Sequence, residues 1–280
     1  MDKMPVINFD GYFADFTSQW VRAHQDEYRN YDEMEDDMPN VYLSFLNTPA
    51  SWLDGITPGA YFTQFEDPKV LVDWLNKYCN CRVPVPDLLT EQIVFVGKPC
   101  EKRLLELLKD TEASEEAKMT AIGLLREMKS PLPKMLYINW QLDRAEKDEM
   151  RDNALESLQE MGETVVQPIL QVIDNANIYG KEALLDVLSR FPGNTKTLKT
   201  ALELFDKMPQ KRAVIAGYLA RIGDEKALPA LIKAAGSEET GYLTYIELRN
   251  AIEELGGDCP ERTFDEDPEY EALRNLDQTL

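Results

Sequence analysis

Apolar residues recur at intervals of three or four positions along most of the chain, and glycine or proline interrupts the pattern. Such spacing places them on one face of an α-helix. The pattern is clearest over residues 151–173 and 212–232, where an amphipathic helix leads to a glycine, Gly162 or Gly223, and then to a second helix. Glycine adopts the left-handed conformation that ends many helices without steric cost. Each segment therefore predicts a hairpin of two helices.

The two segments are copies of one repeat. Placed 61 residues apart, they match at Arg151/Arg212, Leu158/Leu219, Met161/Ile222, Gly162/Gly223, Pro168/Pro229 and Leu170/Leu231. Similar aliphatic spacings at 30 to 33 residues predict further hairpins around residues 122–128, 185–191 and 252–255. Residues 88–108 fit as a degenerate unit. We therefore expect an all-α fold with five or six hairpins over residues 87–258.

One hairpin carries a recognisable order of residues. It runs Arg212-x3-Ala216-x2-Leu219-x2-Ile222-Gly223-Asp224-x2-Ala227-Leu228-Pro229-x-Leu231. This order resembles the short HEAT-like repeat, the type also named for phycobilisome lyases. The resemblance extends over roughly residues 87–257 and implies an α-solenoid, in which each hairpin contacts mainly its neighbours. The repeat consists of packing residues, so the resemblance predicts a fold and no activity.

The resemblance also implies roles for three charged residues. In HEAT-like stacks the repeat arginine commonly pairs with the turn aspartate of an adjoining unit. Asp224 is then expected to pair with Arg212 or with an arginine of a neighbouring hairpin, and Arg151, Arg212 and Asp224 are interpreted as structural. Deoxyhypusine hydroxylases resemble this stack but place His-Glu pairs along it. Because no histidine follows His24, that activity is excluded.

The first 86 residues do not repeat and are rich in aromatic side chains. Residues 10–30 predict an amphipathic helix whose face carries Phe13, Phe16, Trp20, His24 and Tyr28. Residues 41–78 predict three or four short helices around a small aromatic core. Three residue pairs each resemble an N-cap followed by proline in the first helical turn: Thr48-Pro49, Thr57-Pro58 and Asp67-Pro68.

A proline-rich joint suggests where the chain divides. Residues 83–87 read Val-Pro-Val-Pro-Asp, and a residue before proline avoids the α-helical region. We therefore expect an aromatic-rich helical domain over residues 1–86, a HEAT-like solenoid over residues 87–258 and an acidic segment over residues 259–280. The last segment is expected either to cap the final repeat or to form a tail. Its amphipathic positions are Tyr270, Leu273 and Leu276.

The chain is strongly acidic, with 51 acidic and 30 basic residues and a net charge of −21. A field of this sign repels phosphate backbones and anionic lipid, so neither direct nucleic-acid binding nor membrane binding is expected. It favours a protein partner with a basic surface. The acidic run at residues 32–37 does not fit a calcium loop, because Asp37 and Leu43 stand where such a loop needs glycine and glutamate. A solvated run of charge is the preferred interpretation.

The composition excludes several kinds of active site. His24 is the only histidine, so no site within one chain uses two imidazoles. Phosphate-binding glycine loops and the Gly-x-Ser-x-Gly motif are absent. Four unevenly spaced cysteines are expected to be free thiols: Cys79, Cys81, Cys100 and Cys259. We predict no catalytic residue, no metal ligand and no cofactor, and the pattern assigns no binding residues.

These observations favour a non-enzymatic protein–protein interaction scaffold, in which the second helices of the hairpins present acidic side chains to a basic partner. The chain has no long apolar run and no secretory signal, so a cytoplasmic location is expected. Two alternatives remain open. One is an acidic nucleic-acid mimic. The other is a chromophore-lyase-like or ligand-handling protein with a pocket between the N-terminal domain and the solenoid, lined by Trp52, Tyr61, Phe62, Phe65 and Trp74, which otherwise form the core of the small domain.

Overall fold

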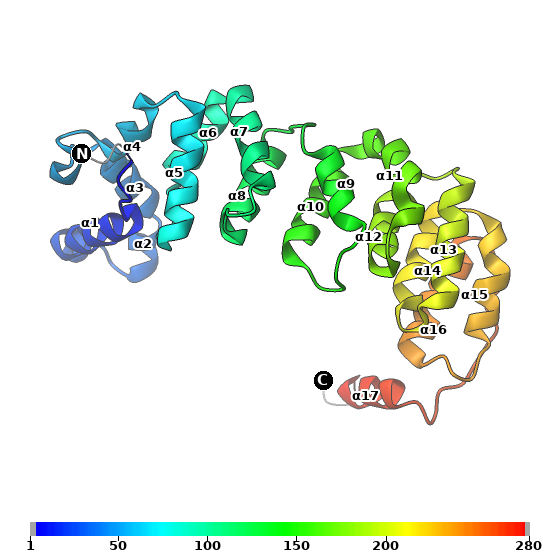
Figure 1. The fold of residues 1–280 in the computed structure, drawn as a ribbon. Coiled ribbons are helices and arrows are strands. Elements are labelled where there is room, and N and C mark those ends of the chain that lie inside the picture. Colours follow the sequence, from blue (N-terminus) through cyan, green and yellow to red (C-terminus); the bar gives the residue numbers. More distant parts are fainter. Residues whose placement is uncertain (1–3, 278–280) are drawn as a thin grey trace. The chain divides into compact units, whose positions relative to one another are not determined.

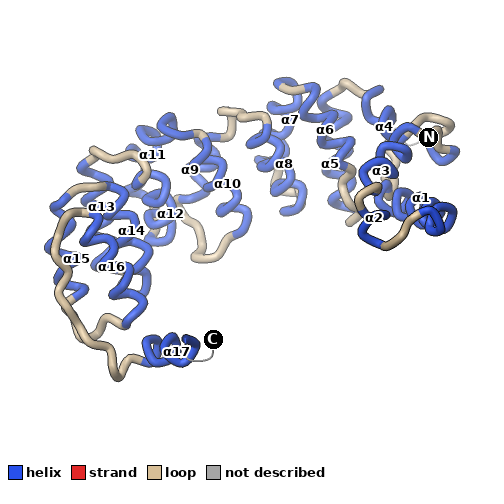
Figure 2. Tube along the Cα trace, turned by 180° about the vertical axis from the view of Figure 1, so that it is seen from behind, coloured by secondary structure: helices blue, strands red, loops and turns tan. Residues whose placement is uncertain are grey.

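The computed structural model describes residues 4–277, except for the side chains of residues 273 and 275–277. The described part of the chain is helical and contains no strand, which confirms the predicted all-α fold (Figures 1 and 2). The chain divides between Pro133 and Lys134 into two compact units. No helix in the described part is both long and apolar enough to cross a lipid bilayer.

The first unit contains eight α-helices among its described residues. They are α1 (Phe9–His24), α2 (Tyr31–Glu35), α3 (Met38–Asn47), α4 (Pro58–Tyr61), α5 (Pro68–Cys81), α6 (Asp87–Val96), α7 (Lys98–Lys109) and α8 (Glu115–Glu127). Three short 3₁₀ helices accompany them: η1 (Gln25–Glu27), η2 (Ser51–Leu53) and η3 (Phe62–Gln64). The helix predicted over residues 10–30 is thus shorter, because η1 and an extended Tyr28 follow His24.

Two of the three predicted N-caps open a helix. Proline stands in the first turn of α4 and of α5, and Oδ1 of Asp67 accepts a hydrogen bond from the Lys69 amide at 2.9 Å. The third prediction is wrong, because Thr48 ends α3 instead of starting a helix. Its hydroxyl donates a 2.6 Å hydrogen bond back to the Ser44 carbonyl. A hydroxyl turned toward the preceding helical turn satisfies a carbonyl there and leaves the following amides without a cap.

One face of α5 forms the core of the first unit. Leu71, Trp74, Leu75 and Tyr78 are fully buried. The helix packs against α6, α7 and α8. Each large side chain moved out of water in this way contributes about 1.5–3 kcal/mol. The joint at residues 83–87, where we expect a domain boundary, connects α5 to α6 within this unit.

The second unit contains the clearest repeats. Its described helices are α9 (Lys134–Gln141), α10 (Glu149–Glu160), α11 (Val166–Val172), α12 (Ile178–Ser189), α13 (Thr195–Lys207), α14 (Arg212–Ile222), α15 (Leu228–Ala235), α16 (Tyr242–Glu254) and α17 (Pro268–Asp277). Short 3₁₀ turns connect them: η4 (Gly162–Val165), η5 (Ile173–Asn175), η6 (Pro209–Lys211) and η7 (Glu225–Ala227). Gly162 and Gly223 adopt φ values of 63° and 71°, which confirms that both end a helix in the left-handed conformation.

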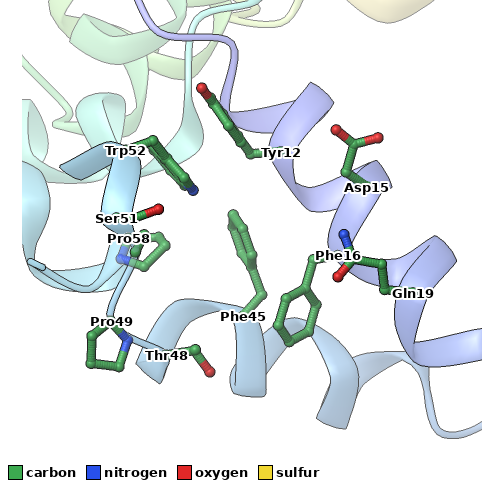
Figure 3. A pocket seen from close by; sticks show the side chains of 11 residues that line it. Tyr12, Asp15, Phe16, Gln19, Phe45, Thr48, Pro49, Ser51, Trp52 and Pro58 are labelled. Carbon is green, nitrogen blue, oxygen red and sulfur yellow. The ribbon is translucent and has the colours of Figure 1, made fainter. Parts of the chain in front are cut away.

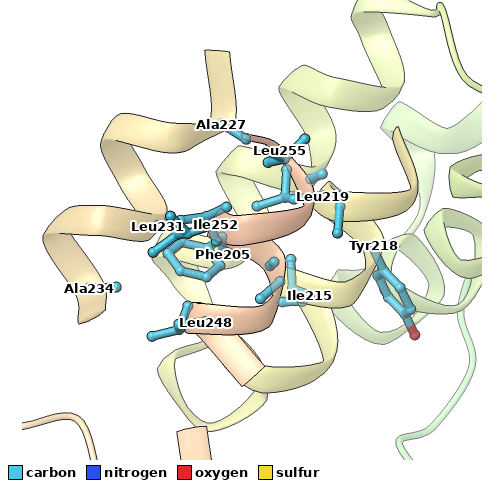
Figure 4. Packing of buried hydrophobic residues seen from close by; sticks show 14 of the residues in the cluster. Phe205, Ile215, Tyr218, Leu219, Ala227, Leu231, Ala234, Leu248, Ile252 and Leu255 are labelled. Atoms are coloured by element: carbon cyan, nitrogen blue, oxygen red, sulfur yellow. The ribbon is translucent and has the colours of Figure 1, made fainter. Parts of the chain in front are cut away.

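Successive hairpins share one apolar core. Leu219 of α14, Leu231 of α15 and Ile252 of α16 are fully buried and lie together in Figure 4. Helix α14 packs against α12 and α13 of the preceding hairpin and against α16 of the following one. The aliphatic positions that repeat in the sequence are therefore the positions that join one hairpin to the next.

The expected ion pair of the repeat is replaced by other contacts. Asp224 caps η7, with Oδ1 3.0 Å from the Lys226 amide, and its ion pair is with Lys226 at 3.7 Å. Nε of Arg212 donates a 3.3 Å hydrogen bond to the Phe205 carbonyl, and its guanidinium lies over the Phe205 ring. Arg151 pairs with two carboxylates of the loop that precedes α10, Asp143 at 3.3 Å and Asp148 at 3.4 Å.

The acidic segment after α16 packs back onto that helix. The Phe264 and Tyr270 rings lie 5.2 and 4.9 Å from the Tyr242 ring. Asp267 and Glu269 accept hydrogen bonds from the first amides of α16, at 3.0 Å and 3.2 Å. Carboxylates are favourable there because a helix N-terminus carries unpaired N–H groups and partial positive charge. The predicted apolar positions Leu273 and Leu276 lie outside the described side chains.

Candidate functional site

His24, the only imidazole, is packed against its own helix. Its Nδ1 donates a 2.8 Å hydrogen bond to the Trp20 carbonyl, and its ring stacks on the Trp20 indole with centroids 4.6 Å apart. The Trp20 ring in turn contacts Tyr28. These contacts hold the imidazole on the predicted aromatic face of α1. They give it a packing role.

The cysteines are free thiols in the structure. Burial raises the pKa of the Cys79 and Cys100 thiols to about 11, so both are protonated at neutral pH. A protonated thiol is a poor nucleophile and a poor metal ligand. Among the described residues, no group of three or more His, Cys, Asp or Glu side chains is arranged to hold a metal ion.

An aromatic groove of about 360 Å³ opens in the first unit (Figure 3). One wall is the face of α1, and the other is the end of α3 with the segment that leads to α4. The Tyr12 and Trp52 rings stack almost in parallel across it, with centroids 4.0 Å apart and an interplanar angle of 7°. The lining residues are Tyr12, Asp15, Phe16, Gln19, Phe45, Thr48, Pro49, Ala50, Ser51, Trp52 and Pro58.

Local rules place these side chains. On α1 they occupy positions spaced by three and four residues, from Tyr12 to Gln19, which share one helix face. On the other wall, Pro49 and Pro58 bracket η2, and the backbone turns sharply at Asp54 and Gly55, whose φ values are positive. Trp52 lies in η2, before this turn, and its indole stacks on Tyr12 of α1. The sequence interpretation recognised Phe16 and Trp52 but missed Tyr12, although the same helical spacing could have identified it.

The five rings predicted to line a pocket are instead mostly core. Trp74 and Phe62 are 0% and 1% exposed, and their centroids lie 5.0 Å apart in an edge-to-face contact. Tyr61 and Phe65 pack on the same Trp74 ring. Of the five, Trp52 alone lines the groove of Figure 3. Edge-to-face packing of so many rings fills the space that a ligand would need.

The acidic run at residues 32–37 is partly ordered by hydrogen bonds. Asp37 accepts hydrogen bonds from the Asn40 amide at 2.6 Å and from the Tyr28 hydroxyl at 2.5 Å, and these bonds, that from Asn40 most, lower the pKa of its carboxyl group. The bond to Asp37 raises the pKa of Tyr28 to about 12. The amide of Arg29 donates to Glu33. Residues 10–37 contain nine carboxylates and two arginines, so most of this negative charge has no nearby cation on the same segment.

A second polar cluster joins three consecutive hairpins. Glu182 of α12 accepts from the Tyr218 hydroxyl of α14 at 3.1 Å and pairs with Lys211 at 2.9 Å. One turn later, Asp186 accepts from Arg221 of α14 and from Gln159 of α10, both at 2.6 Å. Burial and the nearby carboxylates raise the pKa of Tyr218. Both carboxylates are occupied by partners within the stack, so this cluster holds hairpins together and offers little free charge.

Charge is distributed unevenly along the repeats. Residues 174–235 contain ten basic and seven acidic residues, whereas residues 236–277 contain thirteen acidic and three basic ones. Of the second helices, α11 has no charged residue, α15 has only Lys233, and α13 has three lysines against two carboxylates. The expectation that the second helices present acidic side chains is therefore wrong for these hairpins. The acidic excess lies in the segments that flank them.

Comparison with known proteins agrees with the repeat found in the sequence. Residues 211–237 match the family model of the PBS lyase HEAT-like repeat. This match covers α14, η7 and α15 and confirms the predicted HEAT-like repeat there. No curated protein and no solved structure matches the chain.

Proposed function

We propose that this HEAT-like repeat protein is a non-enzymatic scaffold that binds other proteins through acidic segments on either side of its most regular hairpins. A stack of helical hairpins has an extended surface relative to its core, and repeat proteins use such surfaces for binding. The proposal assigns the hairpins to support and the flanking carboxylates to recognition.

The carboxylates on and around α2 are the main support for binding through acidic segments. Asp32, Glu35 and Asp36 are exposed, and no hydrogen bond or ion pair within the described residues engages their side chains. By contrast, Glu182 and Asp186 are both occupied. Unpaired surface charge is available to a basic partner and sets the rate and specificity of association.

Three buried groups with raised pKa values fit a role without catalysis. Catalytic acids and nucleophiles are normally found with perturbed pKa values in an open cleft. Here burial raises the pKa of Cys79, Cys100 and Tyr218, and none of the three lines the groove of Figure 3. Their perturbation follows from packing between helices.

Affinity capture from a cell extract, read by mass spectrometry, tests the proposal. Immobilised wild-type protein is compared with a variant in which Asp32→Asn, Glu35→Gln and Asp36→Asn are combined. Captured proteins should be enriched in basic surfaces, should elute as salt rises and should be lost from the variant, because screening at a Debye length of about 8 Å already weakens exposed charge pairs.

A matched control removes the same amount of charge elsewhere. Glu127, Glu163 and Glu225 are exposed, lie on three separate elements, and change to glutamine together. This control should retain the captured proteins. Capture that is unchanged in the first variant, or that persists at about 1 M salt, contradicts binding through the acidic segments.

A further inference from the structure

The groove of Figure 3 has an exposed aromatic surface that the core does not use. Tyr12 is 39% exposed, and one face of its ring is covered by the stacked indole of Trp52. Pro49 on the opposite wall is also exposed. Below them, Phe45 is 5% exposed and closes the floor. The result is an apolar trough between two walls that are fixed by helix packing.

The charge in the lining of the groove is negative. Asp15 is the charged residue among the lining side chains, and no cation lines the groove. No hydrogen bond or ion pair within the described residues engages the side chains of Asp15, Gln19 or Ser51. Residues 10–37, the segment that carries the α1 wall, contain nine carboxylates and two arginines. An occupant therefore needs a cation beside an apolar portion.

Arginine and lysine meet both demands. Their cationic heads bind carboxylates through charge-assisted hydrogen bonds and are attracted to aromatic faces. The apolar portion of the occupant, next to its cation, must lie on the flat rings of Tyr12 and Trp52 in an open groove. Extended proline-containing segments do this at low entropic cost, because their conformation is already formed before binding and aromatic-lined grooves recognise it. The volume of about 360 Å³ is at the lower end for a binding pocket and suits a few side chains of such a segment.

We propose that this groove binds an extended, proline-containing segment of a partner protein, with an arginine or lysine of that segment on Asp15. The inference rests on the proposed scaffold function and gives it a defined docking site. Tyr12 and Trp52 supply the apolar platform, Asp15 selects the cation, and Gln19 and Ser51 offer hydrogen bonds to the peptide backbone.

Selection from a phage library of random dodecapeptides on the full chain tests this directly. Enriched peptides should contain proline together with arginine or lysine. A selected peptide, made synthetically and labelled for fluorescence anisotropy, should bind the Asp15→Asn variant about tenfold more weakly, as expected for loss of one charge-assisted contact. Replacing its cationic residue by glutamine should cause a similar loss with the wild-type protein.

The control variant is Asp26→Asn, which removes an equal charge from exposed η1 outside the groove and should bind as the wild type does. Tyr12→Ala provides a second test of the groove: it should weaken binding of the selected peptide, and thermal unfolding checks that the variant is folded. Absence of enrichment, enrichment of peptides without cations, or equal binding by the Asp15 and Asp26 variants overturns the inference. If these tests fail while capture still depends on Asp32, Glu35 and Asp36, the groove is excluded and the scaffold function stands. If instead the peptide tests succeed while capture does not depend on Asp32, Glu35 and Asp36, binding through the acidic segments is excluded and the groove stands.

Discussion

The phenolic hydroxyl of Tyr28 donates a 2.5 Å hydrogen bond to Oδ2 of Asp37. This contact joins the residue that follows η1 to the residue that precedes α3. The acidic run at residues 32–37 is therefore not uniform: its last carboxylate has a structural partner, whereas Asp32, Glu35 and Asp36 extend into solvent. Neutralisation of the run should affect stability through Asp37 and through Glu33, which accepts a hydrogen bond from the Arg29 amide.

The Tyr28–Asp37 bond should make stability depend on pH at both extremes. The lowered pKa of Asp37 means that its contribution is present above its ordinary value of 3.8 and is lost as pH falls. The pKa of Tyr28 is raised from 10.0 to about 12, so its contribution is present below pH 10 and is lost as pH rises toward 12. Urea unfolding of wild type and Tyr28→Phe should therefore differ by a constant free energy between about pH 5 and 9. A difference that does not shrink outside this window would falsify the role of the bond.

Two glycines in one hairpin should respond oppositely to alanine. Gly223 has a φ of 71°, which an alanine adopts at a cost of about 1 kcal/mol or slightly more. Gly217 lies inside α14, and a Cβ added there meets no atom within 4 Å. Gly217→Ala should therefore stabilise the chain by roughly 0.5–1 kcal/mol. Denaturant unfolding measures both, and a stabilising Gly223→Ala contradicts the left-handed cap.

Removal of one hydroxyl should test the cluster between hairpins. Tyr218→Phe removes the hydroxyl that donates a 3.1 Å hydrogen bond to Glu182, and this carboxylate keeps its ion pair with Lys211. We expect a loss of about 1 kcal/mol in the free energy of unfolding. The matched change Tyr12→Phe removes a hydroxyl that has no hydrogen-bond partner within the described residues, and it should alter stability by less than about 0.5 kcal/mol. Equal effects of the two changes argue against a structural role for the cluster.

The carboxylate of Asp267 should stabilise the last hairpin. It accepts a hydrogen bond from the Tyr242 amide at the start of α16 and another from the Glu269 amide. Asp267→Ala should lower the free energy of unfolding by about 1 kcal/mol, as for other lost helix caps. Asp265→Ala is the control, because this exposed side chain has no partner within the described residues. Thermal unfolding that ranks the two changes in the reverse order refutes the cap.

Local features of the fold could be predicted because they depend on neighbouring residues. Helix periodicity, the glycine stops at Gly162 and Gly223 and the proline starts at Pro58 and Pro68 are set by backbone geometry within one or two turns. The repeat alignment also predicted which aliphatic side chains become buried, since Leu158 and Leu219 are both fully covered. The aromatic face of α1 followed from the same reasoning.

The candidate groove could not be predicted in the same way. Tyr12 and Trp52 are separated by forty positions in the sequence, and their stacking depends on how α3 and η2 pack on α1. The sequence pattern grouped Trp52 with Trp74, yet packing covers Trp74 completely and leaves Trp52 partly open. Similar aromatic residues thus receive different roles only when distant elements meet.

The helical, repetitive and acidic character of this chain and its single histidine follow from the sequence, because each of these properties is local or compositional. Three contacts depend on the packing of distant elements: Asp224 caps its own turn instead of binding Arg212, Asp186 links three hairpins, and Tyr12 stacks on Trp52. The physical reason is that a helix fixes which side chains share a face, whereas the partner of each face depends on packing between elements far apart in the chain.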